Sequence, residues 1–284
     1  MNPANILGID IGSVSICIAE LSPEKDLIRK SYGFHRGAIN DTLKVMLGDF
    51  NLSEIRAVAA TTSTPSILKI NRKYDNRVSI IAACRHFHEK IGSILLVGGE
   101  KFGLIQFDTD GNYLHFKANT SCAAGTGSFI EEQAQKLGCP LSEYSSRTEH
   151  QKSPMTSDRC TVFMERDLNH YLNEGYTVNE ALTAVLHSVR ENYLTKVADE
   201  NSIGNVISFQ GATARNKALV AAFEQRLGRP ILVSRYCHLT GALGTALLLS
   251  EQNILLTKFR GLGLYEKTIP IQSEVCELCT NHCK

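Results

Sequence analysis

The same short unit occurs twice in this chain: an apolar strand, a glycine-containing turn and a second strand. The first copy spans residues 6–21, with Asp10-Ile11-Gly12-Ser13 at its turn. The second begins with Ser93–Val97 and Gly98-Gly99, and continues into a hairpin around Thr109-Asp110-Gly111-Asn112. An Asp-Gly pair is a strong signal for a tight hairpin turn. The repeat predicts a duplicated α/β fold with a cleft between its two halves.

Hydrophobic periodicity predicts the remaining elements. Strands are expected over residues 55–60, 206–209 and 231–233. Helices are expected over residues 41–50, 78–91, 128–137, 162–173, 178–198 and 216–227, and from Gly241 to about residue 252. Periodicity fades after Leu256, where a linker and a cysteine-rich tail are expected.

Composition excludes several classes of function. The 284 residues carry a formal net charge of +1 and no basic block, which argues against nucleic-acid binding. The apolar runs are too short to cross a bilayer. The first ten residues do not resemble a signal peptide, so we expect a cytoplasmic protein with no membrane partner.

The nine cysteines fall into three groups. In a reducing compartment they are not interpreted as disulfides. Four stand singly among apolar neighbours and are interpreted as small buried residues: Cys17, Cys84, Cys139 and Cys237. Cys122 and Cys160 each precede a helical pattern. The last group closes the chain: Cys276, Cys279 and Cys283.

Three glycine turns follow strands in the order Gly12-Ser13, Gly98-Gly99 and Gly211. Glycine allows the backbone to approach a phosphate, and a strand-end Asp such as Asp10 can reach a hydrated metal ion. The order resembles the actin-like (acetate kinase, sugar kinase, Hsp70) ATPase superfamily. That resemblance implies an α/β fold of two ribonuclease-H-like halves that close around ATP in an interdomain cleft.

A more specific resemblance rests on four segments: Cys122–Gly127, Cys160–Glu165, Gly211–Asn216 and Gly241–Ala246. Over residues 5–250 the chain resembles the BadF/BadG/BcrA/BcrD-type ATPase family, whose members activate 2-hydroxyacyl-CoA dehydratases and benzoyl-CoA reductases. The resemblance implies a first half over 1–90 and a second half over 91–257, whose last helix packs on the first half. Residues 258–284 are the expected linker and tail.

The resemblance also implies a homodimer that shares one [4Fe–4S] cluster, with Cys122 and Cys160 from each subunit as ligands. A cysteine at a helix N-terminus has its thiolate stabilised by the helix dipole and free N–H groups. The implied function is ATP-driven, one-electron transfer at low potential. The implied partners are a CoA-thioester dehydratase or reductase component and a ferredoxin- or flavodoxin-type donor.

The resemblance assigns roles within the nucleotide site. ATP or ADP with Mg²⁺ is the implied ligand, and Asp10 and Glu100 are the candidate catalytic residues. The candidate nucleotide-binding residues are Gly12, Ser13, Gly98, Gly99, Gly211, Ala212, Gly241 and Gly244.

Five positions depart from the family pattern. Leu96 and Lys101 replace the two Asp residues of the second turn, a change that weakens Mg²⁺ organisation. Val14 and Cys17 replace the usual Thr and Lys, and Gln210 replaces a Gly. Whether the chain is an active enzyme is therefore left open. One alternative is a non-hydrolysing, cluster-bearing relay or scaffold domain, and a less favoured one is a small-molecule kinase.

The tail Cys276-x-x-Cys279-x-x-x-Cys283 has metal-ligand spacing, with His282 available to complete it. It equally fits unliganded cysteines at a chain end. Similar clusters follow this domain in long activator-like proteins, which favours a chain that is part of a longer protein. His86 and His88 are interpreted as surface or core residues. Asp158 and Arg159 are predicted either to contact the cluster or to form a solvated ion pair.

Overall fold

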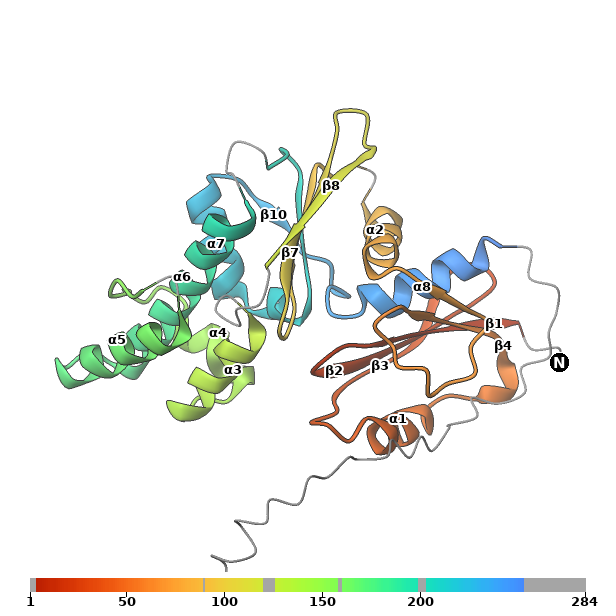
Figure 1. Ribbon diagram of the computed structural model, residues 1–284, viewed down its shortest axis with the longest axis horizontal. Helices are drawn as coiled ribbons and strands as arrows, with labels where there is room; N and C mark the ends of the chain where they lie inside the picture. The colour runs from red at the N-terminus through yellow and green to blue at the C-terminus, as the bar shows by residue number, and fades with distance from the viewer. Residues whose placement is uncertain (1–3, 89, 120–125, 158–159, 199–202, 253–284) are drawn as a thin grey trace, which may run out of the picture.

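The computed structural model describes residues 4–88, 90–119, 126–157, 160–198 and 203–252. It contains two five-stranded sheets with helices packed on them (Figure 1). We call the first sheet with α1 the first lobe, and the second sheet with α3–α7 the second lobe. Within the described residues, no helix is long and apolar enough to cross a membrane.

The first sheet has the strand order β3-β2-β1-β4-β5. Its strands are β1 (Asn5–Ile11), β2 (Ser15–Leu21), β3 (Leu27–Phe34), β4 (Ile55–Thr61) and β5 (Arg72–Tyr74). β1 pairs antiparallel with β2 and parallel with β4, so its carboxyl end and that of β4 lie at the same edge. The helix α1 (Ile39–Leu47) and the 3-10 helix η1 (Leu52–Glu54) connect β3 to β4.

The second sheet has the order β10-β9-β6-β7-β8. Its strands are β6 (Ser93–Val97), β7 (Phe102–Phe107), β8 (Tyr113–Ala118), β9 (Ile207–Gln210) and β10 (Ile231–Leu232). β6 pairs antiparallel with β7 and parallel with β9. The relation of β6 to β7 and β9 repeats that of β1 to β2 and β4, as the duplicated turns predict.

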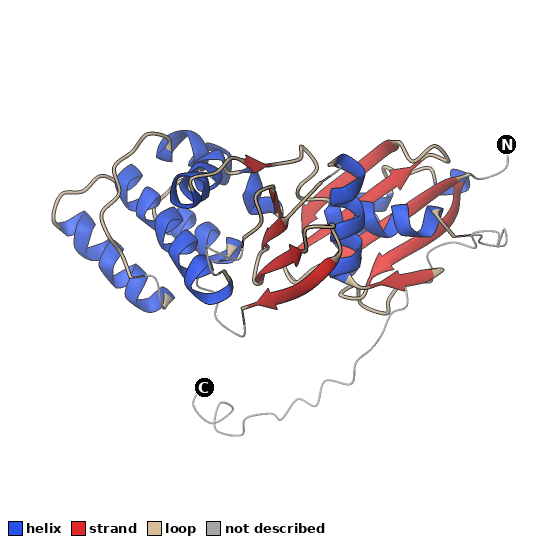
Figure 2. Ribbon diagram, turned by 90° about the horizontal axis from the view of Figure 1, so that it is seen from above, coloured by secondary structure: helices blue, strands red, loops and turns tan. Residues whose placement is uncertain are grey.

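The helices of the second lobe form a separate group beside its sheet (Figure 2). They are α3 (Gly127–Lys136), α4 (Leu141–Thr148), α5 (Thr161–Asn173), α6 (Val178–Val197), the 3-10 helix η3 (Ala212–Arg215) and α7 (Lys217–Leu227). α6 begins with a capping box in which Thr177 and Glu180 bond each other's backbone N–H groups. Most of α6 is buried, and it packs with α3, α4, α5 and α7 into one apolar core.

Two helices, α2 (Asn76–Phe87) and α8 (Thr240–Ser250), lie between the two sheets (Figure 1). α8 packs on β1, β2 and β4 as well as on α2. The approach is very close: a β-carbon at Gly244 would lie 1.7 Å from the Ser79 carbonyl oxygen, and one at Gly8 would lie 1.9 Å from the Ala242 carbonyl oxygen. Glycine permits such backbone contact because it has no side chain.

The predicted elements are all present with shifted ends, and the structure adds others. The helix expected over 78–91 begins at Asn76 and ends at Phe87, and the helix expected over 41–50 begins at Ile39 and ends at Leu47. The expected strand 231–233 is the short β10. The strands β3 and β5 and the helix α4 were not predicted from the sequence.

Candidate functional site

The first two glycine turns have the same hydrogen bond. The Gly12 N–H donates to the Ser15 carbonyl at 3.0 Å, and the Gly98 N–H donates to the Lys101 carbonyl at 2.8 Å. The turns also touch, because a β-carbon at Gly99 would lie 2.5 Å from Val14 Cγ2. The predicted turn residues of the two lobes therefore meet at one place.

Asp10, the strand-end carboxylate of the first turn, is bound by hydroxyl groups from the end of β4. Its Oδ1 accepts from Thr61 Oγ1 at 2.6 Å and from Ser63 Oγ at 3.1 Å. Thr64 Oγ1 accepts from the Ile11 N–H at 3.1 Å, which ties this loop to β1. Burial raises the pKa of Asp10, and the bonds from Thr61 and Ser63 act in the opposite direction.

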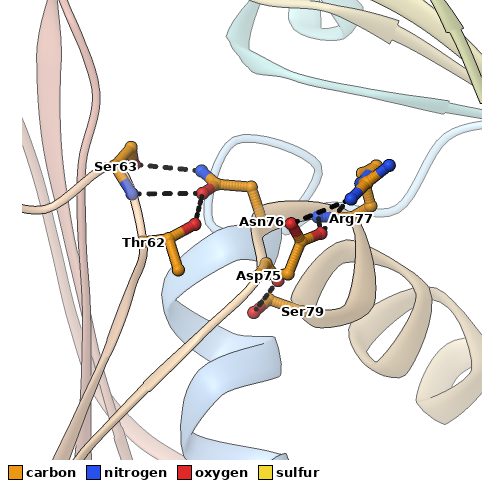
Figure 3. A network of polar contacts seen from close by, with 6 residues as sticks. All are labelled: Thr62, Ser63, Asp75, Asn76, Arg77 and Ser79. Atoms are coloured by element: carbon orange, nitrogen blue, oxygen red, sulfur yellow. Dashed lines mark hydrogen bonds and ion pairs between the residues drawn. The ribbon is translucent and has the colours of Figure 1, made fainter.

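Asn76, at the start of α2, holds the same loop from the other side (Figure 3). Its Oδ1 accepts from Thr62 Oγ1 at 2.9 Å and from the Ser63 N–H at 3.2 Å, while its Nδ2 donates to Ser63 Oγ at 3.0 Å. Asp75 caps α2 and pairs with Arg77 (Figure 3). A chain of polar contacts thus joins Asp10 to an interlobe helix.

Sequence reasoning did not single out Thr61, Ser63 or Asn76. A signal was available: the hydroxyl run at residues 61–64 directly follows the predicted strand 55–60. The position of Asn76 against this run depends on the packing of α2 and could not be inferred from spacing.

The second turn has an apolar residue where the first has its aspartate. Leu96 precedes Gly98 by two positions, as Asp10 precedes Gly12. Leu96 faces Gln210 on the neighbouring strand β9. Gln210 Nε2 donates to Ser208 Oγ, and its buried Oε1 has no hydrogen-bond partner within the described ranges. Glu100, the proposed catalytic residue of this turn, is exposed, and so is Lys101.

The third turn packs directly on the second. Gly211 has a φ of 108°, and a β-carbon there would lie 2.2 Å from the Val97 carbonyl oxygen. Thr213 Oγ1 donates to the same carbonyl at 2.7 Å. Ala212 begins η3, which leads into α7. Only glycine suits a positive φ at such close range, so the predicted glycine is required at this position.

The two glycines of α8 have different surroundings. A β-carbon at Gly241 would lie 2.2 Å from Asp10 Oδ2, so this glycine borders the candidate site. Gly244 lies against the backbone of α2 at Ser79. The geometry gives Gly244 a packing role between the two helices. Whether either glycine touches a nucleotide stays a prediction.

A cavity of about 690 Å³ opens beside α7, the helix that follows the third turn. The residue motifs gave no sign of it. Its walls come from α6, α7, the end of α4 and the loop after it: Thr148, Glu149, His150, Gln151, Lys152, Ser153, Thr183, Leu186, His187, Lys217, Ala218, Ala221, Ala222 and Gln225. Burial, with Arg190 nearby, lowers the pKa of His187, which favours the neutral ring. Four of these lining residues are apolar and lie on α6 and α7, and the other ten are polar or charged.

The N-terminus of α3 is bonded to the second turn. The Gly127 N–H donates to the Gly98 carbonyl at 2.9 Å, and the Ser128 N–H donates to the Gly99 carbonyl at 2.8 Å. These carbonyls satisfy N–H groups that lack partners inside the helix. Residues 120–125, including Cys122, lie outside the described ranges, and the described chain resumes at Thr126.

Cys160 stands at the N-cap of α5, partly exposed and without a side-chain capping bond. Next to it on α5, Val162 is 69% exposed and Phe163 is 50% exposed. The four cysteines expected to be buried are buried: Cys17, Cys84, Cys139 and Cys237. Burial raises the pKa of Cys84 to about 12, so that thiol stays protonated.

Several predicted ligands cannot be placed. Cys276, Cys279 and Cys283 lie outside the described residues, as do Asp158 and Arg159. Among the residues that the structure describes, no group of three or more His, Cys, Asp or Glu side chains is arranged to hold a metal ion. His86 is exposed, and His88 is half-buried with an Nε2 that has no hydrogen-bond partner within the described ranges.

Residues 73–249, more than half of the chain, match the model of the BadF/BadG/BcrA/BcrD ATPase family. The 2-hydroxyisocaproyl-CoA dehydratase activator of Clostridioides difficile is 31% identical over 156 residues, which is 55% of this chain and 58% of that protein. The (R)-2-hydroxyglutaryl-CoA dehydratase activating ATPase of Acidaminococcus fermentans is 26% identical over 85% of this chain and 95% of its own length.

The solved structure of an activator of the 2-hydroxyisocaproyl-CoA dehydratase from Clostridium difficile, with bound ADPNP, has a TM-score of 0.77. It is 23% identical to this chain and aligns over 87% of this chain and 94% of its own. The fold expected from the three glycine turns, an actin-like ATPase fold with two related α/β halves, is confirmed.

Proposed function

Since the chain belongs to the BadF/BadG/BcrA/BcrD ATPase family, we propose that it is an ATP-binding activator that transfers electrons to a CoA-thioester dehydratase or reductase. The observation that carries the proposal is the meeting of the two glycine turns beside Asp10, with the second turn bonded to α3. A nucleotide-responsive turn is thereby joined to the helix that follows Cys122.

Nucleotide phosphates would bind at the turns Gly12-Ser13 and Gly98-Gly99, where glycine allows a ligand to approach the backbone closely. The adenine base would occupy the cavity beside α7, the helix that follows Gly211 and Ala212 in the chain. This cavity has apolar walls on α7 and the cationic Lys217 at its edge. Gly241 would leave room for Asp10 to face the phosphates.

Asp10 would orient either a hydrated Mg²⁺ or the attacking water. Thr61 and Ser63 fix its Oδ1 and leave Oδ2 for that task. With Leu96 in place of a second strand-end carboxylate, Asp10 would carry most of this role, and Glu100 would assist from the exposed turn. Slow hydrolysis is the expected consequence.

A [4Fe–4S] cluster would be held by Cys122 and Cys160 from each of two subunits. Cys160 fits such a ligand, because its thiol is accessible and no capping bond occupies it. The first turn of α5 would stabilise the thiolate through its free N–H groups. When bound, the cluster would supply one-electron transfer at low potential. The exposed Val162 and Phe163 would become buried in the dimer.

A second candidate is a non-hydrolysing relay or scaffold of the same dimer. Two observations favour it: Leu96 at the position of the second carboxylate, and the Val14 side chain against Gly99, which narrows the space between the turns. A small-molecule kinase is disfavoured, because a kinase needs a base near the transferred phosphate and has no use for paired cysteine ligands. The electron donor would be of the ferredoxin or flavodoxin type, and the compartment the cytoplasm.

Anaerobic purification of the full chain tests the proposal through its visible absorption, iron content and ATP turnover. Cys122→Ala and Cys160→Ala should each abolish the chromophore. Cys139→Ala, which alters a buried cysteine, is the matched control and should keep it. A full chromophore in Cys160→Ala would contradict the proposed ligands. Absent ATP hydrolysis beside an intact chromophore would select the relay.

A further inference from the structure

The loop that follows β3 is fastened to the first glycine turn by a histidine. His35 is 6% exposed, and its Nδ1 accepts from the Gly37 N–H at 3.1 Å. Its Nε2 must then carry the proton, which it donates to the Gly12 carbonyl at 3.1 Å. The His35 N–H also donates to the Val14 carbonyl. The loop is therefore fixed relative to the turn.

The next residue, Arg36, has an unfavourable backbone conformation. Its φ is 45°, in the left-handed region that non-glycine residues rarely adopt, and Gly37 follows with a φ of 87°. The side chain is exposed and makes no ion pair with any residue in the described ranges. Residues held in such conformations gather at functional sites, where the strain positions a side chain.

Arg36 lines a cavity of about 200 Å³ that lies between the lobes. Ser13 of the first turn borders the same cavity, with Val14 and Phe34 as apolar walls and Glu131 of α3 on the opposite side. The volume equals that of roughly seven liquid water molecules, enough for a phosphoryl group with some water. The first turn itself, residues 10–15, contains no basic side chain.

We propose that Arg36 is the phosphate-binding cation of this nucleotide site, acting beside the Ser13 hydroxyl and held in place by His35. The inference rests on the proposed nucleotide function and adds a residue to it. A guanidinium offers several N–H donors in a planar arrangement that matches phosphate oxygens. Glu131 opposes bound phosphate by like charge, so an anion in this cavity lies on the Arg36 side.

Because Arg36 and Glu131 carry opposite charges, substitutions at the two residues distinguish phosphate binding by Arg36 from an ion pair between the lobes. If the cavity holds a phosphate, removing Arg36 weakens ATP binding and neutralising Glu131 strengthens it. If the two residues only clasp the lobes together, both substitutions change binding in the same direction.

The experiment measures the dissociation constants of ATP and ADP by calorimetry on the full chain. Arg36→Gly is the main variant, because glycine accepts the positive φ and preserves the turn. We expect its binding to weaken about tenfold, and Arg36→Lys to retain part of the affinity. Glu131→Gln should bind about threefold more tightly. Lys44→Ala removes a positive charge at an exposed position of α1, and this variant should bind ATP as tightly as the unmodified chain does.

Thermal unfolding of Arg36→Gly supplies the second readout. A variant that unfolds at the same or a higher temperature, yet binds ATP more weakly, supports a residue strained for binding. Unchanged ATP binding in Arg36→Gly overturns the inference while leaving the proposed function standing. A lower unfolding temperature, or equal directions of change for Arg36→Gly and Glu131→Gln, overturns it as well. Failure of the unmodified chain to bind either nucleotide would refute the proposed nucleotide function together with the inference.

Discussion

Gly244→Ala tests the crossing of α2 and α8, on which the relation of the two lobes depends. The added β-carbon would lie 1.7 Å from the Ser79 carbonyl oxygen and 2.4 Å from its carbon. Both are backbone atoms, so no side-chain rotation relieves the overlap, and the helices must separate by about 1.5 Å to reach ordinary contact. Overpacking of this kind costs about 1–3 kcal/mol, and a clash with rigid backbone belongs at the upper end.

Alanine also favours the helical state over glycine by about 1 kcal/mol, which opposes the clash. We therefore expect a net loss of about 2 kcal/mol, or a fall of about 5 °C in the midpoint of thermal unfolding followed by circular dichroism. Gly48→Ala is the matched control. Gly48 has a φ of −59° at the end of α1, and its nearest atom, 3.1 Å away, belongs to the preceding turn of that helix. If Gly244→Ala unfolds within about 1 °C of the unmodified chain, the close crossing is wrong.

Three further outcomes follow from the polar network and the groups around it. Asn76→Ala removes the bonds that hold Ser63 beside Asp10, and we expect about 1 kcal/mol lower stability and weaker ATP binding, measured by calorimetry. Asp10→Asn removes a carboxylate whose pKa burial raises. In the unmodified chain, the folded state therefore keeps the Asp10 carboxyl protonated above pH 3.8, and the protein loses stability as the pH rises through the raised pKa. The variant should be the more stable protein at pH 7, while its ATP turnover is lost. Burial, and secondly the positive charge of Arg215, lowers the pKa of His238 from 6.5 to about 4. Between these pH values the unfolded chain binds a proton that the native state does not bind. His238→Asn should therefore lose less stability than the unmodified chain between pH 6.5 and about 4 in urea titrations, by about 1–2 kcal/mol because solvent screens this half-buried ring.

The two glycine turns could be predicted because their signals are local. An apolar run, a glycine pair and a second apolar run define β1–β2 and β6–β7 without information from elsewhere in the chain. β3 was not predicted because it is an edge strand with Arg29 and Lys30 at exposed positions, so its alternation of apolar and polar residues is weak. α4 was not predicted because its sequence is short and polar, and only Tyr144 and Thr148 are buried in it.

The surroundings of Asp10 could not be predicted, because they come from distant parts of the chain. Ser63 is 53 residues away in sequence, and Asn76 reaches it only because α2 begins beside the end of β4. The same limit applies to Arg36, whose left-handed backbone is a property of the folded loop. The role of Gly244 likewise emerged from the packing of α8 on α2, since the sequence suggested a ligand contact.

The ratio of iron to protein in the anaerobically purified dimer tests the central claim most directly. Two cysteines from each subunit around one four-iron cluster predict about two iron atoms per chain, in a species with the mass of two chains. Cys160→Ala should lower the ratio to near zero. A ratio of about four iron atoms per chain that survives Cys160→Ala would place the cluster on other cysteines and contradict the shared site.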